Sequence, residues 1–291
     1  MIIAGIVVLC AGLYYSLPHI LDYIRSRDAY DEIRDEYVRD PEEEEETEAG
    51  NTGSVQPAPS VKIPEKAEDT EIMPEAETEK VSSLLSEGEI LAGKYPALEV
   101  KGKALKKKNS DYVGWVYVPG TDISYPVVYT GNNDDYLHKG FNGGYSYAGT
   151  IFLDERNKGT TDEKHMILYG HNMRDGSMFA KIKSFEDQDF YEKHPVFWFI
   201  TPDKAMLFQI FTAYVAQPRD FDVTYSVEAE EFNTYEEFAD ILKKMEEYSE
   251  IKTNVFPDSS DQIMALSTCT NARVTRFTVT GKLVYETVVK D

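Results

Sequence analysis

Hydrophobic and polar residues follow three different patterns along the chain. Residues 2–17 are almost wholly apolar, and with Ile20 and Leu21 this run approaches the ~20 residues that a transmembrane helix needs. Residues 40–80 are rich in Glu, Pro, Thr and Ala with almost no aromatic side chains, so they cannot bury enough apolar surface to offset chain entropy. From residue 114 onward, β-branched and aromatic runs are separated by Gly, Pro and Asn, which is typical of strands.

The strand-like runs predict a mainly β fold. They cover residues 114–118, 123–128, 149–153, 165–170, 196–201, 206–217, 262–268 and 276–289. A set of this size suits a closed or nearly closed eight-stranded β-barrel. Helices are expected before the first strand, over 83–91 and 97–109, and again over 234–248, where apolar residues recur with helical spacing.

The N-terminal apolar segment, residues 1–21, is predicted to be a membrane anchor. Tyr14 and Tyr15 suit an interfacial aromatic belt. A cleaved signal peptide is an alternative, but it needs a basic start and an A-x-A-like cleavage site, and neither is clear. A buried core helix of the same length is the other alternative. Arginines follow the segment, so the positive-inside rule does not favour a C-terminus outside the cell.

The chain beyond the anchor divides into two predicted parts. Residues 22–80 are expected to form a juxtamembrane helix over 22–39 and then an acidic disordered tether, and residues 81–291 a folded catalytic domain. A flexible chain of ~40 residues spans about 35 Å, enough to carry the domain off the bilayer. Because this segment shows no β pattern and few groups that could pack, deletion of residues 1–80 is expected to leave a folded, active domain.

Charge and composition narrow the functional classes. The formal net charge over 291 residues is −22, and much of the acidic excess lies between Glu42 and Glu79, in blocks that are usually solvated. Such a chain repels phosphates, which argues against nucleic-acid binding. The five histidines show no ligand spacing with the two cysteines, so no metal and no cofactor is predicted.

Cys269 is the foremost candidate for chemistry. The other cysteine, Cys10, lies in the apolar N-terminal run, so no disulfide is expected and Cys269 stands alone at the end of a strand. His171 ends another strand and Arg276 begins the last one. These three side chains are the parts of a cysteine acyl-transfer site. The imidazole can deprotonate the thiol and later protonate a leaving amine, and the permanently charged guanidinium can donate hydrogen bonds to an oxyanion.

Each of these residues also has a structural interpretation. Cys269 could be a buried structural thiol, and His171 a hydrogen-bonded turn residue. Arg276 could be a surface arginine with Arg273 as its rival, but the alternation over 277–282 places Arg276 at the strand start. The remaining candidate histidines match no motif and are interpreted as surface or structural residues: His138, His165 and His194.

The same residues resemble a class B sortase. The sortase signature is similar to three features of this sequence: Leu-Ser-Thr directly before Cys269, Arg276 at the start of the next strand, and Tyr-Gly directly before His171 upstream. Three further blocks resemble family segments in the same order: 114–128, 149–157 and 170–179. The resemblance spans roughly residues 89–291. It implies a sortase-like eight-stranded β-barrel with N-terminal helices and a helix between strands 6 and 7 that walls the substrate groove.

The resemblance implies a membrane-anchored cysteine transpeptidase of the Gram-positive cell surface, with a single-pass anchor and an extracellular catalytic domain. Cys269 would cleave the C-terminal sorting signal of a surface protein after a Thr and hold the cargo as a thioester. An amine of a peptidoglycan precursor or a pilin lysine would resolve it, while His171 and Arg276 act as acid–base and oxyanion donor. Four residues are expected to contact the substrate: Ser267, Thr268, Asn133 and Leu137.

Several alternatives stay open. Asn133 could be a turn residue only. The protein could be a cysteine hydrolase or protease that releases free acid, or a surface protein that keeps the barrel for binding alone. Ala265 stands where the signature usually has Thr, and Thr270 and Asn271 follow the cysteine where some class B enzymes carry acidic residues. The sorting motif, the acceptor amine and the cargo are therefore not predicted.

Overall fold

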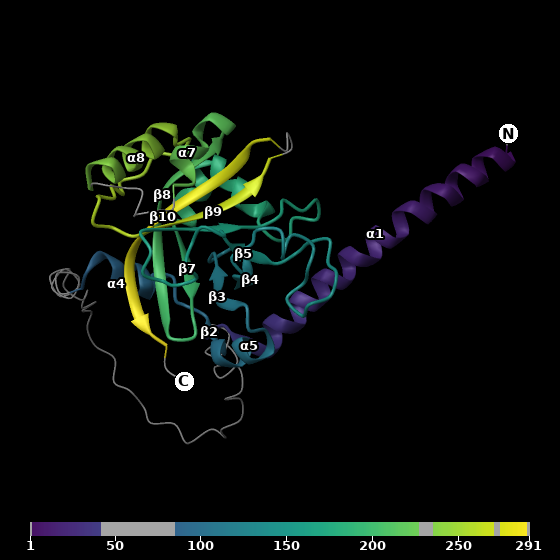
Figure 1. Ribbon diagram of the computed structural model, residues 1–291, viewed down its shortest axis with the longest axis horizontal. Helices are drawn as coiled ribbons and strands as arrows, with labels where there is room; N and C mark the ends of the chain where they lie inside the picture. The colour runs from purple at the N-terminus through teal and green to yellow at the C-terminus, as the bar shows by residue number, and fades with distance from the viewer. Residues whose placement is uncertain (1, 42–84, 227–234, 271–273, 290–291) are drawn as a thin grey trace, which may run out of the picture.

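The fold is a closed β-barrel with helices packed around it (Figure 1). The computed structural model describes residues 2–41, 85–226, 235–270 and 274–289. The barrel strands are β3 (Tyr112–Tyr117), β4 (Ser124–Val128), β5 (Ile151–Leu153), β6 (His165–Tyr169), β7 (Val196–Ile200), β8 (Lys204–Ala216), β9 (Ile263–Cys269) and β10 (Arg276–Val288). Each overlaps one of the eight predicted ranges, so the predicted eight-stranded barrel is confirmed.

The strands close in the order β10-β8-β7-β3-β4-β5-β6-β9. Most neighbours are antiparallel, but β4 pairs with β5 and β6 pairs with β9 in parallel. Parallel neighbours cannot be joined by a tight hairpin and need long crossover connections. The segment between β4 and β5 is such a connection, and it becomes important for the site.

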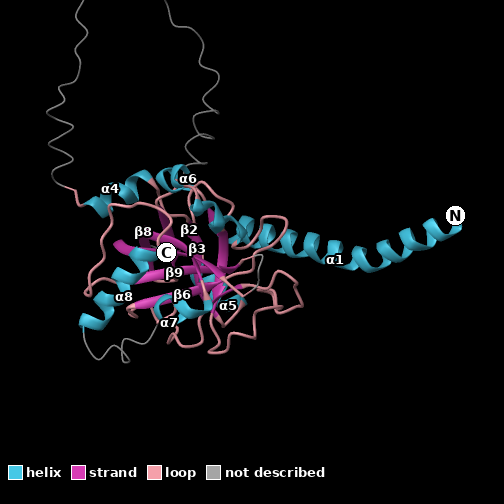
Figure 2. Ribbon diagram, turned by 90° about the horizontal axis from the view of Figure 1, so that it is seen from above, coloured by secondary structure: helices cyan, strands magenta, loops and turns pink. Residues whose placement is uncertain are grey.

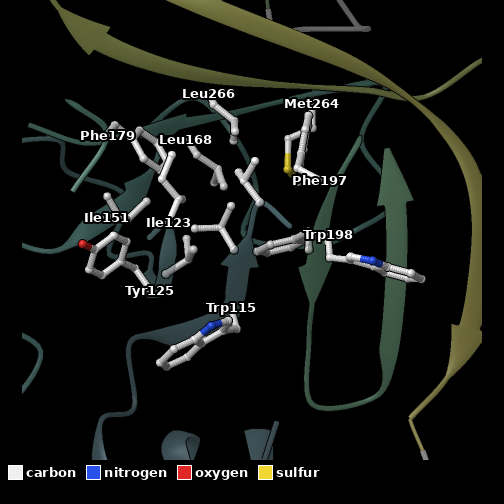
Figure 3. Close-up of a cluster of buried hydrophobic side chains, with 14 of the residues drawn as sticks. Trp115, Ile123, Tyr125, Ile151, Leu168, Phe179, Phe197, Trp198, Met264 and Leu266 are labelled. Carbon is white, nitrogen blue, oxygen red and sulfur yellow. The ribbon is translucent and has the colours of Figure 1, made fainter. Parts of the chain in front are cut away.

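Aromatic and aliphatic side chains fill the barrel (Figure 3). Trp115, Phe197 and Leu266 point into one cluster, and all three are fully buried. The two tryptophans keep their N–H groups paired. The Trp115 indole donates to Ser124 Oγ at 2.9 Å, and the Trp198 indole donates to the Tyr95 carbonyl at 2.8 Å. A buried indole without an acceptor would lose free energy, so these bonds fix both rings.

The helices lie outside the barrel. They are α1 (Ile2–Tyr37), α4 (Glu87–Lys94), α5 (Gly102–Lys108), α6 (Gln188–Lys193), α7 (Phe221–Thr224) and α8 (Tyr235–Tyr248), with 3₁₀ turns η1 (Ala180–Glu186) and η2 (Pro218–Asp220). Helix α8 lies between the sixth and seventh barrel strands, as predicted, and buries Phe238, Leu242 and Met245 against β8.

One helix expected from the sequence is shorter than predicted. Residues 97–101 do not join α5, because β2 (Glu99–Val100) pairs instead with β1 (Val38–Arg39). The Lys101 N–H also donates to the Tyr37 carbonyl at 2.9 Å. Backbone pairing with a segment distant in sequence therefore overrides the local helical pattern.

Helix α1 packs on the barrel with its C-terminal half and projects away from it toward the N-terminus (Figures 1 and 2). Tyr30 and Ile33 are buried, and Ser26 Oγ lies 2.9 Å from Ser146 Oγ. Residues 22–37 are thus helical as predicted, but their packing was not anticipated. Within the described residues, no helix combines the length and apolar character needed to cross a bilayer, and the anchor over 1–21 is not confirmed.

Both described flanks of the acidic segment contact the barrel domain. On one side β1 pairs with β2, and on the other Gly88 of α4 lies so close to Val284 that a Cβ would meet the Val284 carbonyl oxygen at 2.1 Å. The predicted tether itself, over 40–80, falls almost wholly outside the described residues. The described residues on either side of it, up to 41 and from 85, both belong to segments that pack on the barrel domain.

Deleting residues 1–80 should destabilise the barrel relative to a variant that lacks only residues 1–21. Burial of a large apolar side chain contributes about 1.5–3 kcal/mol, and the larger deletion removes Tyr30 and Ile33. We expect the free energy of unfolding to fall by about 3 kcal/mol, measured by urea unfolding of both variants. Equal unfolding midpoints and slopes would show that α1 adds no stability.

Candidate active site

The register of β9 and β10 brings Cys269 and Arg276 together. These two strands pair antiparallel, and Cys269 and Arg276 are directly opposite each other across the ladder. The connection between them is closed by the Thr270 N–H, which donates to the Thr275 carbonyl at 3.1 Å. Cys269 is a free, half-buried thiol. Backbone pairing therefore makes Arg276 the direct neighbour of Cys269, and both residues line one cavity.

His171 reaches the same place because β6 runs parallel to β9. Tyr169 pairs with Ser267, and the Gly170 N–H then donates to the Ser267 carbonyl at 3.1 Å. The Asn172 amide donates to the Cys269 carbonyl at 2.9 Å, which ties the residue after His171 to the backbone of Cys269. A Cβ at position 170 would lie 2.4 Å from Ile151 Cδ1 and 2.7 Å from the Phe179 ring, so any larger residue would displace these side chains.

The orientation of His171 is fixed by one hydrogen bond. Its Nε2 lies 2.8 Å from the Leu137 carbonyl oxygen, and because a carbonyl only accepts, Nε2 carries the proton. The neutral ring therefore keeps its lone pair on Nδ1, as a general base requires. Burial lowers the pKa of His171, the hydrogen bond to Leu137 opposes this, and the neighbouring His138 lowers it further.

All seven residues singled out in the sequence line one cavity of about 320 Å³. They are Cys269, His171, Arg276, Ser267, Thr268, Asn133 and Leu137. They come from β9, β10, the end of β6 and the crossover between β4 and β5, so the cavity exists only in the folded barrel. Their individual roles stay predictions, but the structure brings them into one place.

The four predicted substrate contacts have internal partners. The Thr268 hydroxyl donates to the Gly170 carbonyl at 2.7 Å, and Ser267 Oγ lies 2.9 Å from the Tyr225 hydroxyl. The Asn133 side-chain oxygen accepts from the Glu155 N–H at 2.9 Å, which fits the alternative of a turn residue. Leu137 supplies the carbonyl to His171. These groups hold the cavity in shape, and contact with a substrate stays a prediction for them.

An aromatic wall of the cavity was not predicted. Rings of Phe152, Tyr169, Tyr225 and Phe221 follow one another with centroid separations of 5.5, 5.8 and 5.1 Å. The Tyr169 hydroxyl donates to Asp154, whose carboxylate binds Arg156 at 2.9 Å. The four-residue spacing of Phe221 and Tyr225 after a strand was the available sequence signal. Such a wall gives this side of the cavity an apolar, aromatic surface.

Two residues considered in the sequence analysis lie outside the described residues. The rival arginine, Arg273, and the candidate orienting residue, Asn271, both lie in the undescribed part of the β9–β10 connection. Across the described ranges, no group of His, Cys, Asp and Glu side chains is arranged to hold a metal ion. The chemistry available from the described cavity is that of the thiol, imidazole and guanidinium.

Comparison with known proteins identifies the family. The Sortase domain matches residues 116–284. Sortase B of Listeria monocytogenes is 38% identical over 183 residues, which cover 62% of this chain and 72% of that protein. The X-ray structure of Clostridium perfringens sortase B is 34% identical with a TM-score of 0.58, covering 63% of this chain and 99% of that chain.

A crystal structure of sortase B complexed with triglycine is also similar, with 30% identity and a TM-score of 0.59, covering 72% of this chain and 96% of that chain. The barrel, the site at the end of β9 and these matches agree. The chain belongs to the sortase family and, within it, to the class B sortases. Sortases are cysteine transpeptidases.

The protonation of His171 can be measured directly. Because burial lowers its pKa, we expect its NMR titration midpoint to lie below about 6.5, so that the ring is neutral at pH 7. The Cys269→Ala variant removes coupling to the thiol, and His171→Asn assigns the resonance. A midpoint above 7 in Cys269→Ala would mean that the resting ring is cationic and that the account of its environment is wrong.

Proposed function

We propose that this chain is a membrane-anchored transpeptidase that cleaves a C-terminal sorting signal after a Thr and transfers the acyl group to an amine. The observation that carries the proposal is the convergence of three strand ends. Arg276 faces Cys269 across the β9–β10 ladder, and Asn172, next to His171, holds the Cys269 carbonyl. Nothing in the packing of the barrel alone requires a thiol, an imidazole and a guanidinium at one cavity.

The first half-reaction acylates the enzyme. Neutral His171 takes the thiol proton of Cys269 on Nδ1, and the thiolate attacks the Thr carbonyl carbon. The carbonyl oxygen becomes an oxyanion, which the Arg276 guanidinium stabilises by donating hydrogen bonds. When the C–N bond breaks, His171 returns its proton to the leaving amine. The cargo is then joined to Cys269 as a thioester.

The second half-reaction releases the cargo onto an acceptor. An amine attacks the thioester carbonyl, His171 removes a proton from the attacking nitrogen, and Cys269 leaves as a thiolate. The similar sortase B complexed with triglycine supports an amino-terminal glycine as one acceptor class. A peptidoglycan precursor amine and a pilin lysine are the other candidates.

The proposed setting is the outer face of the cell membrane. The apolar run of residues 2–17 and the family support an anchor, with the catalytic domain outside the cell. Because α1 packs on the barrel through Tyr30 and Ile33, the domain would sit close to the bilayer rather than at the end of a tether. A site near the membrane suits cargo whose sorting signal ends at a membrane segment.

Cys269→Ala should abolish cleavage of a quenched fluorescent peptide library that carries Thr at the scissile position. The thiol is the proposed nucleophile, so kcat/KM should fall by at least about a thousandfold. Cys10→Ala is the matched control, because it removes the other cysteine outside the cavity. Cleavage by Cys269→Ala at the wild-type rate would contradict the assignment of Cys269 as the nucleophile.

The fate of the thioester distinguishes transfer from hydrolysis. Triglycine, diaminopimelate or a Lys-bearing pilin fragment should each be added separately to enzyme and cleavable peptide. Transfer gives a new, amine-linked product with at least one acceptor, resolved by liquid chromatography and mass spectrometry. If every acceptor leaves free acid as the sole product, the protein is a cysteine hydrolase.

A further inference from the structure

A row of rings leads from α1 to the catalytic imidazole. The His138 ring stacks on the His171 ring, with centroids 5.5 Å apart and planes inclined by 12°. Tyr147 stacks on His138 at 6.0 Å and 24°, and Tyr23 of α1 contacts Tyr147 at 5.5 Å. His138 was interpreted from the sequence as a surface or structural residue. The structure places it over the ring that is proposed to move protons.

His138 and Tyr147 lie on the two arms of one hairpin, residues 138–147, within the β4–β5 crossover. The Ser146 N–H donates to the His138 carbonyl at 3.0 Å, and Lys139 pairs with Tyr145. Gly143, with φ +88°, makes the turn that brings the arms together. Leu137, whose carbonyl accepts from His171, directly precedes the hairpin. The crossover therefore contacts the catalytic ring both at its edge and on its face.

Helix α1 holds this crossover through residues spaced four apart. The Asp22 carboxylate accepts from the Tyr147 N–H at 2.7 Å, and Ser26 Oγ lies 2.9 Å from Ser146 Oγ. The Tyr30 hydroxyl donates to the Gly149 carbonyl and lies 3.0 Å from Thr150 Oγ1. A spacing of four places Asp22, Ser26 and Tyr30 on one helix face. These bonds all go to the crossover and none to the nucleophile's strand.

We propose that His138 is a positioning residue for the acyl-transfer reaction and that α1 holds it against His171. The stacked ring limits rotation of the catalytic imidazole about its hydrogen bond to Leu137 and shields one face from water. Positioning of this kind lowers the entropy lost on reaching the transition state. The inference rests on the proposed role of His171 as general base and acid.

The electrostatic surroundings predict in which direction the pKa of His171 changes when His138 is replaced. Burial lowers the pKa of His171, and removing the ring of His138 would rehydrate His171 and withdraw a neighbouring basic group. Both changes should raise the pKa of His171. Titratable and charged groups on the elements around the two rings include Asp22 and Tyr23 of α1, Asp134, Asp135, Tyr136, Lys139, Tyr145 and Tyr147 of the crossover, Arg174 and Asp175 after His171, Cys269 and Arg276.

The first test needs no turnover. In the Cys269→Ala background of the full chain, the NMR titration midpoint of His171 should rise toward about 6.5 in His138→Ala. His138→Phe keeps a stacking ring, so its midpoint should stay closer to that of the parent. An unchanged midpoint in His138→Ala overturns the inference. Because no peptide is cleaved, this result is independent of whether the proposed transpeptidase activity is found.

The second test uses kinetics on a cleavable peptide. His138→Ala should lower kcat about tenfold with little change in KM, and His138→Phe should restore most of the loss. Asp22→Ala should lower kcat in the same way, whereas Asp28→Ala, an exposed carboxylate on the same helix, should not. If α1 acts through His138, the double variant Asp22→Ala/His138→Ala is no slower than His138→Ala.

Two kinetic outcomes would contradict the inference. A wild-type kcat for His138→Ala overturns the positioning role of His138. Losses in Asp22→Ala and His138→Ala that multiply fully in the double variant overturn the link through α1, because independent effects add in free energy. Thermal melts check that each variant is folded, and because His138 is exposed, its replacement should leave the core intact.

Discussion

The candidate site depends on the position of β9 between β6 and β10. Its pairing with β6 is parallel and its pairing with β10 is antiparallel, so the end of β9 meets the end of β6 and the start of β10. Cys269, His171 and Arg276 are neighbours for that reason. Because side chains alternate along a strand, a slip of β9 by one residue would turn the Cys269 side chain to the other face. The fully buried side chains of Met264 and Leu266 in the barrel oppose such a slip.

The parallel pairing of β4 and β5 has a second consequence for the site. It requires a long crossover, and this segment supplies both the Leu137 carbonyl and the His138 ring to His171. A long connection has few ladder bonds of its own, so its geometry depends on what packs against it. Here α1 provides that support through Tyr30, Ser26 and Asp22. The same helix that contains the expected anchor segment is thereby part of the scaffold of the site.

The strands were predictable because each carries its own signal. Runs of β-branched and aromatic residues bounded by Gly, Pro and Asn mark all eight barrel strands, and the family resemblance placed Cys269, His171 and Arg276 at their ends. Contacts between distant segments were not predictable from local patterns. The pairing of Val38 with Val100 removed the start of one predicted helix, and nothing around Tyr30 in the sequence indicates a partner at Gly149.

His138 shows the same limit within the site. Its neighbours mix polar, glycine and aromatic residues without a regular period, so no pattern marks the ring as a contact of His171. The contact forms only when the crossover folds against the end of β6 and places His138 on His171. The aromatic wall has the same origin, since Tyr169 comes from β6 and Phe221 and Tyr225 from the segment after β8. The sequence predicted the reacting groups, and the folded barrel shows which side chains contact them.

The central claim is that Cys269 carries the acyl group, and intact-protein mass spectrometry tests it most directly. The full chain is incubated with a cleavable peptide and no added amine, quenched in acid and digested for site assignment. The account predicts a mass increase equal to the acyl fragment ending in Thr, located on Cys269, absent in Cys269→Ser and released as a hydroxamate by hydroxylamine. Peptide cleavage without an adduct on Cys269, or with a hydroxylamine-sensitive adduct on another residue, would contradict it.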